Sequence, residues 1–203
     1  MVAVIAILVT LMTAGISLLS GTGNQSRRAG VDMLSGMIEQ ARTTAITSRS
    51  YVVLAIAEPG DLPAGDERCR IGLFKVEMEK WPTTSTSPIS VTATLLSRWQ
   101  TLNTGIVLIG GEADGVPNPL DSPKMTINYG GTKNLSIQVH AIAFNSRGGL
   151  LSPDGSTPIA LRIAEGGYRN GKATPNMRAG QKAVTENRLK IGRVTARPYQ
   201  IDG

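Results

Sequence analysis

The residues best able to carry out chemistry are few in this chain and lie far apart. His140 is the only histidine and Cys69 the only cysteine among 203 residues. A serine or cysteine nucleophile needs a base beside it, and a structural metal site needs several ligands. The sequence contains no G-x-S-x-G, S-x-x-K or H-E-x-x-H motif and no glycine-rich phosphate loop. We therefore expect that the protein is not an enzyme.

Acidic and amide side chains gather in one loop. Residues 110–121 read GGEADGVPNPLD and contain Glu112, Asp114, Asn118 and Asp121. Oxygen ligands at this density can hold Ca²⁺, but their spacing does not match an EF-hand loop. We expect no cofactor and no metal, with calcium in this loop as the less favoured alternative.

The net charge of +6 comes from the C-terminal fifth of the chain. Residues 162–203 contain nine Lys or Arg side chains against three Asp or Glu, whereas residues 1–161 contain 12 of each. A basic surface of this kind can bind nucleic-acid phosphates, although aromatic residues for stacking on single strands are scarce there. We favour a solvated basic face and keep weak nucleic-acid binding as the alternative. Its candidate contacts are Arg169, Lys172, Arg178, Lys182, Arg188 and Lys190.

The elements that must position these side chains begin with an apolar run. The first 26 residues contain no ionisable side chain, and only Thr10, Thr13 and Ser17 are polar within residues 1–19. A helix of roughly 20 apolar residues crosses a hydrocarbon core of about 30 Å. We therefore predict that residues 1–25 form the transmembrane or filament-core half of a helix. The side chains assigned to this role are Val4, Ile5, Ile7, Leu8, Leu11, Met12, Ile16 and Leu19.

The helical pattern continues as an amphipathic half over residues 26–49. Val31, Leu34, Ile38, Ala41 and Ala45 recur at spacings of three and four, the period of a helix with one buried face. We expect these five side chains to pack the helix against a sheet.

Residues 50–203 are expected to form one β-rich globular domain. Short apolar and β-branched runs recur between turns rich in Gly, Pro, Ser, Thr and Asn, without helical patterns between them. This cadence predicts an antiparallel sheet in which 51–57 pairs with 70–78. The fold class is therefore α+β, with a long N-terminal helix packed on an antiparallel sheet domain. The other predicted strands are 90–96, 105–109, 125–129, 135–144, 157–163 and 188–198, with loops at 81–88, 110–124 and 166–182.

Several short segments, in this order, resemble a known family. The apolar run MVAVIAILVTL resembles the segment of type IV pilin-like proteins that follows the prepilin cleavage site. Residues 33–54, MLSGMIEQARTTAITSRSYVVL, are similar to the GspH/FimT group of minor pseudopilins, in which an A-R-x-x-A element leads the helix into the first strand. FNSRGGL at 144–150 resembles that group's turn before a strand, and NRLKIGRVTAR at 187–197 resembles its closing strand. With SRWQTL at 97–102, these segments resemble a subgroup named Verru_Chthon cassette protein D.

The resemblance implies a type IV pilin-like fold and a structural role as a minor pilin or pseudopilin. Such a protein is a single-pass subunit of the inner membrane, with its globular domain in the periplasm or on a surface filament. Its partners are the membrane and other subunits of a type IV pilus or a type II secretion-like filament. Two alternatives stay open: a DNA-binding minor pilin of a DNA-uptake machine and, less favoured, a membrane-tethered enzyme.

The family pattern also contains a basic leader, a glycine at the cleavage site and a glutamate early in the mature chain. The sequence begins within the apolar segment and shows none of these three features. We therefore expect that the N-terminus is truncated, and that prepilin peptidase is a partner if a leader precedes Met1.

Overall fold

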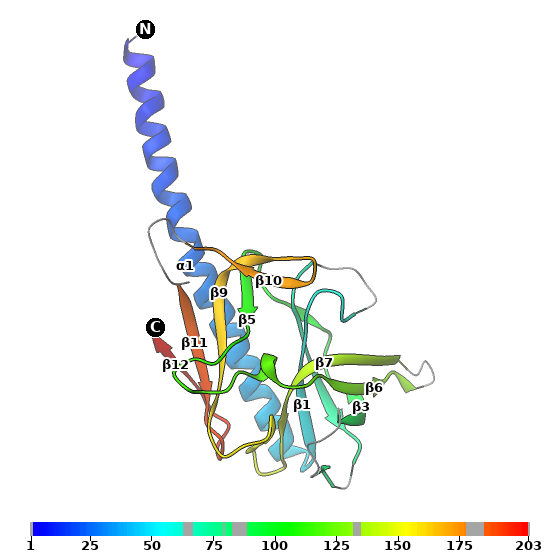
Figure 1. The fold of residues 1–203 in the computed structure, drawn as a ribbon. Coiled ribbons are helices and arrows are strands. Elements are labelled where there is room, and N and C mark those ends of the chain that lie inside the picture. Colours follow the sequence, from blue (N-terminus) through cyan, green and yellow to red (C-terminus); the bar gives the residue numbers. More distant parts are fainter. Residues whose placement is uncertain are drawn as a thin grey trace.

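The structure is a computed structural model that describes residues 2–62, 67–78, 80–82, 89–131, 135–177 and 185–202; for residues 2–24 and 202 it describes the backbone alone. A long helix is followed by a series of strands, with the short 3-10 helix η1 between two of them (Figure 1). The elements are α1 (Val2–Thr47), β1 (Tyr51–Ala57), β2 (Arg70–Val76), β3 (Ser90–Leu95), β4 (Gln100–Thr101), β5 (Ile106–Ile109), η1 (Pro119–Asp121), β6 (Met125–Tyr129), β7 (Leu135–Phe144), β8 (Leu150–Ser152), β9 (Ile159–Arg169), β10 (Lys172–Pro175), β11 (Glu186–Ile191) and β12 (Pro198–Asp202).

Five of the strands close into a small barrel. β1 pairs with β2, β2 with β3, β3 with β6 and β6 with β7, and β7 pairs in turn with β1. β4 and β8 join the rim by pairing with β2 and β7. The barrel interior is a separate apolar core that includes Val53, Phe74, Ile127 and Val139.

A second sheet has the order β10, β9, β11 and β12, and β5 joins it beside β9. Helix α1 packs against this sheet and against the barrel at the same time. Leu54 of β1, Leu161 of β9 and Leu189 of β11 belong to one buried cluster together with the apolar face of the helix. This cluster is the main core of the domain.

β1 is buried on both of its faces. Val52, Leu54 and Ile56 belong to the core around the helix, whereas Val53 and Ala55 belong to the barrel interior. Successive side chains of a strand point to opposite faces. The uninterrupted apolar sequence of β1 follows from this double burial.

The amphipathic half of α1 supplies the helical side of the main core. Val31, Leu34, Ile38, Ala41 and Ala45 are between 0% and 3% exposed. Gly30 precedes this stripe at a close approach: a Cβ there would lie 2.9 Å from the Cδ1 atom of Ile106. In Figure 1 the N-terminal part of α1 extends past the sheets, while its C-terminal part lies against them.

The helix ends in a turn that leads directly into β1. Arg49 adopts a left-handed φ of 48°. The Arg49 N–H donates to the carbonyl of Ile46 at 3.3 Å, and the Ser50 N–H donates to that of Ala45 at 3.2 Å. This pair of bonds is a Schellman motif, which satisfies carbonyls that the end of a helix leaves open.

The prediction of an antiparallel sheet is wrong at one pair of strands. β3 and β6 run parallel, with Val91 opposite Ile127. Between them the chain crosses to the second sheet to form β5 and returns through η1. Parallel neighbours need such a long crossover, and the sequence pattern does not reveal where it leads.

Two predicted boundaries in the C-terminal part are also wrong. The glycine-rich segment 166–182 was expected to be a loop, but β9 continues to Arg169 and pairs with β10. Gly166 serves the pairing, because a Cβ there would lie 2.3 Å from the carbonyl oxygen of Thr174. The predicted strand 188–198 is divided into β11 and β12 by a tight turn, in which the Ala196 N–H donates to the carbonyl of Gly192 at 2.8 Å.

Replacing Ile38 with aspartate should destabilise the domain strongly. Ile38 is fully buried, and an unpaired carboxylate buried there should lower the free energy of unfolding by about 3 kcal/mol or more. Urea denaturation of the full chain, followed by circular dichroism, measures the difference. Gln40→Asp, at an exposed position of the same helix, is the control and should change this free energy by less than about 0.5 kcal/mol. Equal midpoints for the two variants would contradict the packing of α1.

Candidate functional site

A buried ion pair attaches α1 to the second sheet just before the apolar stripe begins. Arg27 is 5% exposed, and its Nε atom lies 3.6 Å from the Oε1 atom of Glu165 on β9. Removing one partner of a buried pair leaves the other charge uncompensated, which is strongly destabilising. The pair therefore opposes separation of the helix from β9 at this point.

A second polar contact attaches the helix near its C-terminal end. The Arg42 Nε atom donates to the carbonyl oxygen of Thr195 at 2.6 Å, in the turn between β11 and β12. The same guanidinium lies 3.3 Å from the Glu39 carboxylate, one turn earlier on the helix. Polar contacts to the second sheet thus lie at both ends of the apolar stripe.

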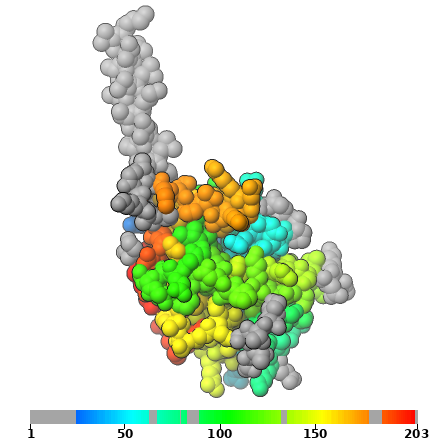
Figure 2. Space-filling view, in the orientation of Figure 1, coloured from blue at the N-terminus to red at the C-terminus, as the bar shows by residue number. Residues whose placement is uncertain are grey.

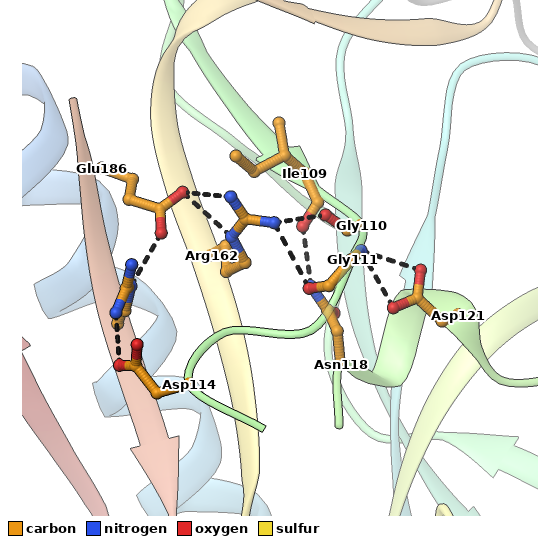
Figure 3. A network of polar contacts seen from close by, with 9 residues as sticks. Ile109, Gly110, Gly111, Asp114, Asn118, Asp121, Arg162 and Glu186 are labelled. Atoms are coloured by element: carbon orange, nitrogen blue, oxygen red, sulfur yellow. Dashed lines mark hydrogen bonds and ion pairs between the residues drawn. The ribbon is translucent and has the colours of Figure 1, made fainter. Parts of the chain in front are cut away.

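The outer face of the second sheet carries a polar network (Figure 3). Arg162 on β9 and Arg188 on β11 are direct cross-strand neighbours. Both point away from the helix, because Leu161, Ile163 and Leu189 beside them belong to the main core. Two like charges in this position repel one another.

Glu186 lies between the two guanidinium groups and bridges them. Its Oε2 atom accepts hydrogen bonds from Nε and Nη2 of Arg162 at 2.9 and 2.7 Å, and its Oε1 atom accepts one from Nε of Arg188 at 2.7 Å. Asp114, from the loop before η1, forms an ion pair with the other side of Arg188. Burial raises the pKa of Glu186, but the hydrogen bonds and charges of both arginines outweigh burial, so its pKa lies below the ordinary value.

The same network fixes the loop at residues 110–121. Arg162 Nη1 donates to the carbonyl of Gly110 at 2.8 Å. Both carboxylate oxygens of Asp121 accept from the Gly111 N–H at 2.9 Å. Asn118 Nδ2 donates to the carbonyl of Ile109 at 2.7 Å.

These contacts bear on the calcium alternative for this loop. Asp121 points at a backbone N–H, Asp114 pairs with Arg188, and the Asn118 side-chain oxygen accepts from the Leu120 N–H. Within the described ranges, no group of three or more His, Cys, Asp or Glu side chains could hold a metal ion. Hydrogen bonds and ion pairs therefore engage the oxygen atoms of these three side chains.

His140 lies in a separate polar cluster beside the barrel. Its Nε2 atom is 3.5 Å from Glu58 Oε2, and its Nδ1 atom is 3.2 Å from the carbonyl oxygen of Ser122. Lys124 contacts Asp61 at 2.7 Å and Glu58 at 3.5 Å. The pKa of Glu58 lies below its ordinary value, chiefly because of the hydrogen bond with His140, with Lys124 adding to the effect. The cluster ties the turn after β1 to the segment before β6.

Cys69 is fully buried next to β2. Burial raises the pKa of its thiol to about 12. A thiol is nucleophilic as the thiolate, so this environment disfavours reactivity.

Four of the six candidate nucleic-acid contacts are described, and they lie on β9, β10 and β11 of the second sheet, whose β9–β10 hairpin (orange) is at the surface in Figure 2. Arg188 is engaged by two carboxylates, and Lys190 lies further along β11, partly exposed. Arg169 and Lys172 are exposed and face each other across the β9–β10 hairpin. Arg178 and Lys182 lie outside the described residues.

The residues assigned to the membrane or filament half of the helix cannot be placed individually. Their side chains lie outside the described part of the chain; they are Val4, Ile5, Ile7, Leu8, Leu11, Met12, Ile16 and Leu19. Among the residues that are described, no helix combines the length and apolar character needed to cross a membrane.

Sequence reasoning missed the Arg27–Glu165 pair and the network around Glu186. Arg27 directly follows the apolar run, where a flanking charge is ordinary, so nothing in the pattern indicates its burial. A signal for Glu186 and Arg188 was present: they alternate with Asn187, Leu189 and Ile191, which predicts one charged and one buried strand face. Their partners Arg162 and Asp114 lie on distant segments and could not be inferred.

Comparison with known proteins finds a solved structure that resembles this chain. No family model and no curated protein matches the sequence. The chain is similar to the crystal structure of the type IV minor pilin FimU from Pseudomonas aeruginosa strain PAO1, with 10% sequence identity and a TM-score of 0.41. The similarity covers 89% of this chain and 90% of that one.

Replacing Glu186 with glutamine should destabilise the protein at neutral pH but not in acid. The neutral amide leaves Arg162 and Arg188 opposite each other without the carboxylate between them, and we expect a loss of about 1 to 3 kcal/mol in the free energy of unfolding. Because the folded-state pKa is lowered, the parent's advantage is complete above the unfolded-state pKa of about 4.3 and disappears as the pH falls through the lower folded-state value. Denaturation curves from pH 7 to pH 3 measure it. Glu112→Gln, on an exposed loop residue, should leave stability unchanged; a pH-independent loss in Glu186→Gln would contradict the ionic role.

Proposed function

We propose that this protein is a structural subunit of the minor pilin or pseudopilin class. In this proposal the N-terminal half of α1 holds the chain in a membrane and later packs among equivalent helices in a type IV pilus or a type II secretion-like filament. The observation that carries the proposal is that α1 is much longer than the part of it that belongs to the main core. α1 extends from Val2 to Thr47, yet the helix residues of the main core lie between Val31 and Ala45.

The composition of the preceding part suits both environments. Residues 1–26 contain no ionisable side chain, and a helix satisfies its own backbone hydrogen bonds, as a lipid environment requires. A helix apolar on all faces can equally be buried among other helices. The same surface therefore fits storage in a membrane and assembly into a filament core.

The polar attachments of the helix support a mechanical role. A subunit that displays a domain along a filament needs a firm joint between the assembling helix and the domain. The Arg27–Glu165 pair and the Arg42–Thr195 hydrogen bond lie near the two ends of the apolar stripe and provide such a joint. The proposed location is the inner membrane, with the domain in the periplasm or on the filament surface, and prepilin peptidase acts if a leader precedes Met1.

A second candidate function is weak nucleic-acid binding by such a subunit. Arg169 and Lys172 are exposed and lie opposite each other on the β9–β10 hairpin. Two adjacent cations can contact phosphates. The neutralisation of Arg188 by Glu186 and Asp114 removes one of the other candidate contacts.

Placing charges in the apolar half of α1 should abolish both anchoring and assembly. Each aspartate in Leu8→Asp/Leu11→Asp costs about 2.5 to 3.5 kcal/mol at the centre of a membrane-spanning helix. In cells that assemble the filament, we expect the doubly substituted chain to move to the soluble fraction and to be missing from sheared filaments. Immunoblots of membrane, soluble and sheared fractions measure this.

The matched control is Thr43→Asp, an exposed position in the other half of the helix, which should distribute like the parent. Unchanged fractionation of the double variant would remove the membrane anchor from the proposal. A parent chain that integrates into the membrane but never enters filaments would remove the subunit role.

Nucleic-acid binding should be weak and strongly dependent on salt. We expect a dissociation constant of about 10⁻⁴ to 10⁻⁶ M for duplex DNA at physiological salt, with a log–log salt slope of roughly 0.9 per phosphate contacted. Arg169→Ser/Lys172→Ser should lower that slope by up to about 2. Lys75→Ser/Lys80→Ser, which removes two exposed cations elsewhere, is the control for charge alone. If both double variants lose affinity equally, the hairpin is not the binding site.

A further inference from the structure

The barrel is incompletely paired where β3 and β6 run side by side. Their parallel pairing ends at Thr92 and Asn128. β3 continues to Leu95, paired on its other edge with β2. β6 instead leads into Gly130 and Gly131, whose positive φ values of 90° and 55° turn the chain.

A cavity of about 590 Å³ opens where the two strands part. We call this place the β3–β6 seam. It is lined by residues 92–95 of β3, by residues 128–131 at the end of β6, and by Glu77.

The hydrogen-bond pattern shows which backbone groups of β3 face the seam. The Glu77 N–H donates to the carbonyl of Thr92, and the Leu96 N–H donates to that of Leu73, so these positions of β3 face β2. The backbone groups of successive strand residues point to opposite edges. The N–H and C=O of Leu95 therefore point to the seam, and no described residue forms a ladder pair with them on that edge.

The side chains around the seam define what can lie in it. Leu95 and Tyr129 pack against the barrel interior, and the Tyr129 ring centroid is 5.2 Å from that of Phe74. Among the described residues of the lining, Glu77 alone carries a charge, and it accepts a hydrogen bond from Thr94 Oγ1 at 2.5 Å. Within the described residues, the seam thus combines strand backbone without a ladder partner, the apolar side chains of Leu95 and Tyr129, and the exposed carboxylate of Glu77.

We propose that the β3–β6 seam binds an extended segment of another polypeptide by strand addition. The segment's backbone hydrogen-bonds to the open edge at Leu95, one of its apolar side chains lies against Leu95 and Tyr129, and a Lys or Arg side chain faces Glu77. Backbone pairing supplies affinity in this mode of recognition, and alternate side chains supply specificity. This role goes beyond filament assembly, because it uses the barrel face and not α1.

The test uses the full chain and a labelled peptide, TVKVTVKT, whose alternation of apolar and basic residues matches the lining. Fluorescence anisotropy should show saturable binding, and hydrogen–deuterium exchange should slow in the segments around residues 92–96 and 128–131. The same peptide with every second backbone amide N-methylated cannot pair as a strand. It should bind at least about tenfold more weakly, which corresponds to one or two lost hydrogen bonds.

A pair of variants at Leu95 isolates the backbone contribution. Leu95→Pro removes the N–H that faces the seam, while Thr94 and Leu96 keep the N–H groups that face β2; we expect it to weaken binding by about tenfold. Leu95→Ala keeps the N–H and should bind more tightly than Leu95→Pro.

No saturable binding to the parent chain would overturn the proposal. Equal affinity of the N-methylated peptide, or equal affinity of the Leu95→Pro variant, would do the same. If thermal melts show that Leu95→Pro unfolds, the N-methylated peptide and the exchange data on the parent decide the question.

Discussion

The apolar core around α1 joins the barrel to the second sheet. The Leu150 N–H of β8 donates to the carbonyl of Arg193 in the β11–β12 turn at 3.0 Å, but the two sheets share no strand pair in the part of the chain that is described, so no strand ladder holds them together. Leu34, Ile38 and Ala41 instead lie in one cluster with residues of β1, β9 and β11. Because the burial of apolar surface is the dominant favourable term in folding, the relative position of the sheets depends on the helix. Gly30, just before the stripe, lets the second sheet approach the helix closely, because a Cβ there would lie 2.9 Å from the Cδ1 atom of Ile106 on β5.

Polar contacts fix the position of the helix along the sheets more narrowly than the apolar core does. Hydrophobic burial is non-directional, and it would tolerate some sliding of the helix along the sheets. The Arg27–Glu165 pair and the bond from Arg42 to Thr195 are directional and oppose such sliding. On the opposite face of the second sheet, the Glu186 carboxylate lies between Arg162 of β9 and Arg188 of β11 and offsets their repulsion. Arg162 in turn donates a hydrogen bond to the 110–121 loop. The positive charge counted in the C-terminal fifth of the chain is therefore partly neutralised at close range.

The sequence predicts elements of this fold well where one periodicity is sustained. The strands β1, β6 and β7 have the predicted bounds, 51–57, 125–129 and 135–144, because each combines β-branched or apolar residues with clear turns on both sides. The five residues of the helix stripe likewise share one face and are buried. Barrel closure and the parallel β3–β6 pair could not be predicted, since they depend on the path of the chain through the second sheet. The partners of Arg27 and Arg188 were out of reach for the same reason: Glu165 and Asp114 are far away in sequence.

Because α1 is one continuous helix, the number of residues that precede the core determines how the domain is rotated about the helix axis. Each residue of an α-helix turns the chain by about 100°, and the stripe from Val31 to Ala45 fixes which side of the helix meets the sheets. The length of the segment before Arg27 therefore sets the direction in which the domain faces, as seen from the N-terminal end. One residue more or fewer in that segment would leave the core intact and yet point the barrel face a quarter of a turn or more away. The number of residues in the helix therefore determines the orientation of the domain about the helix axis as well as its distance along that axis.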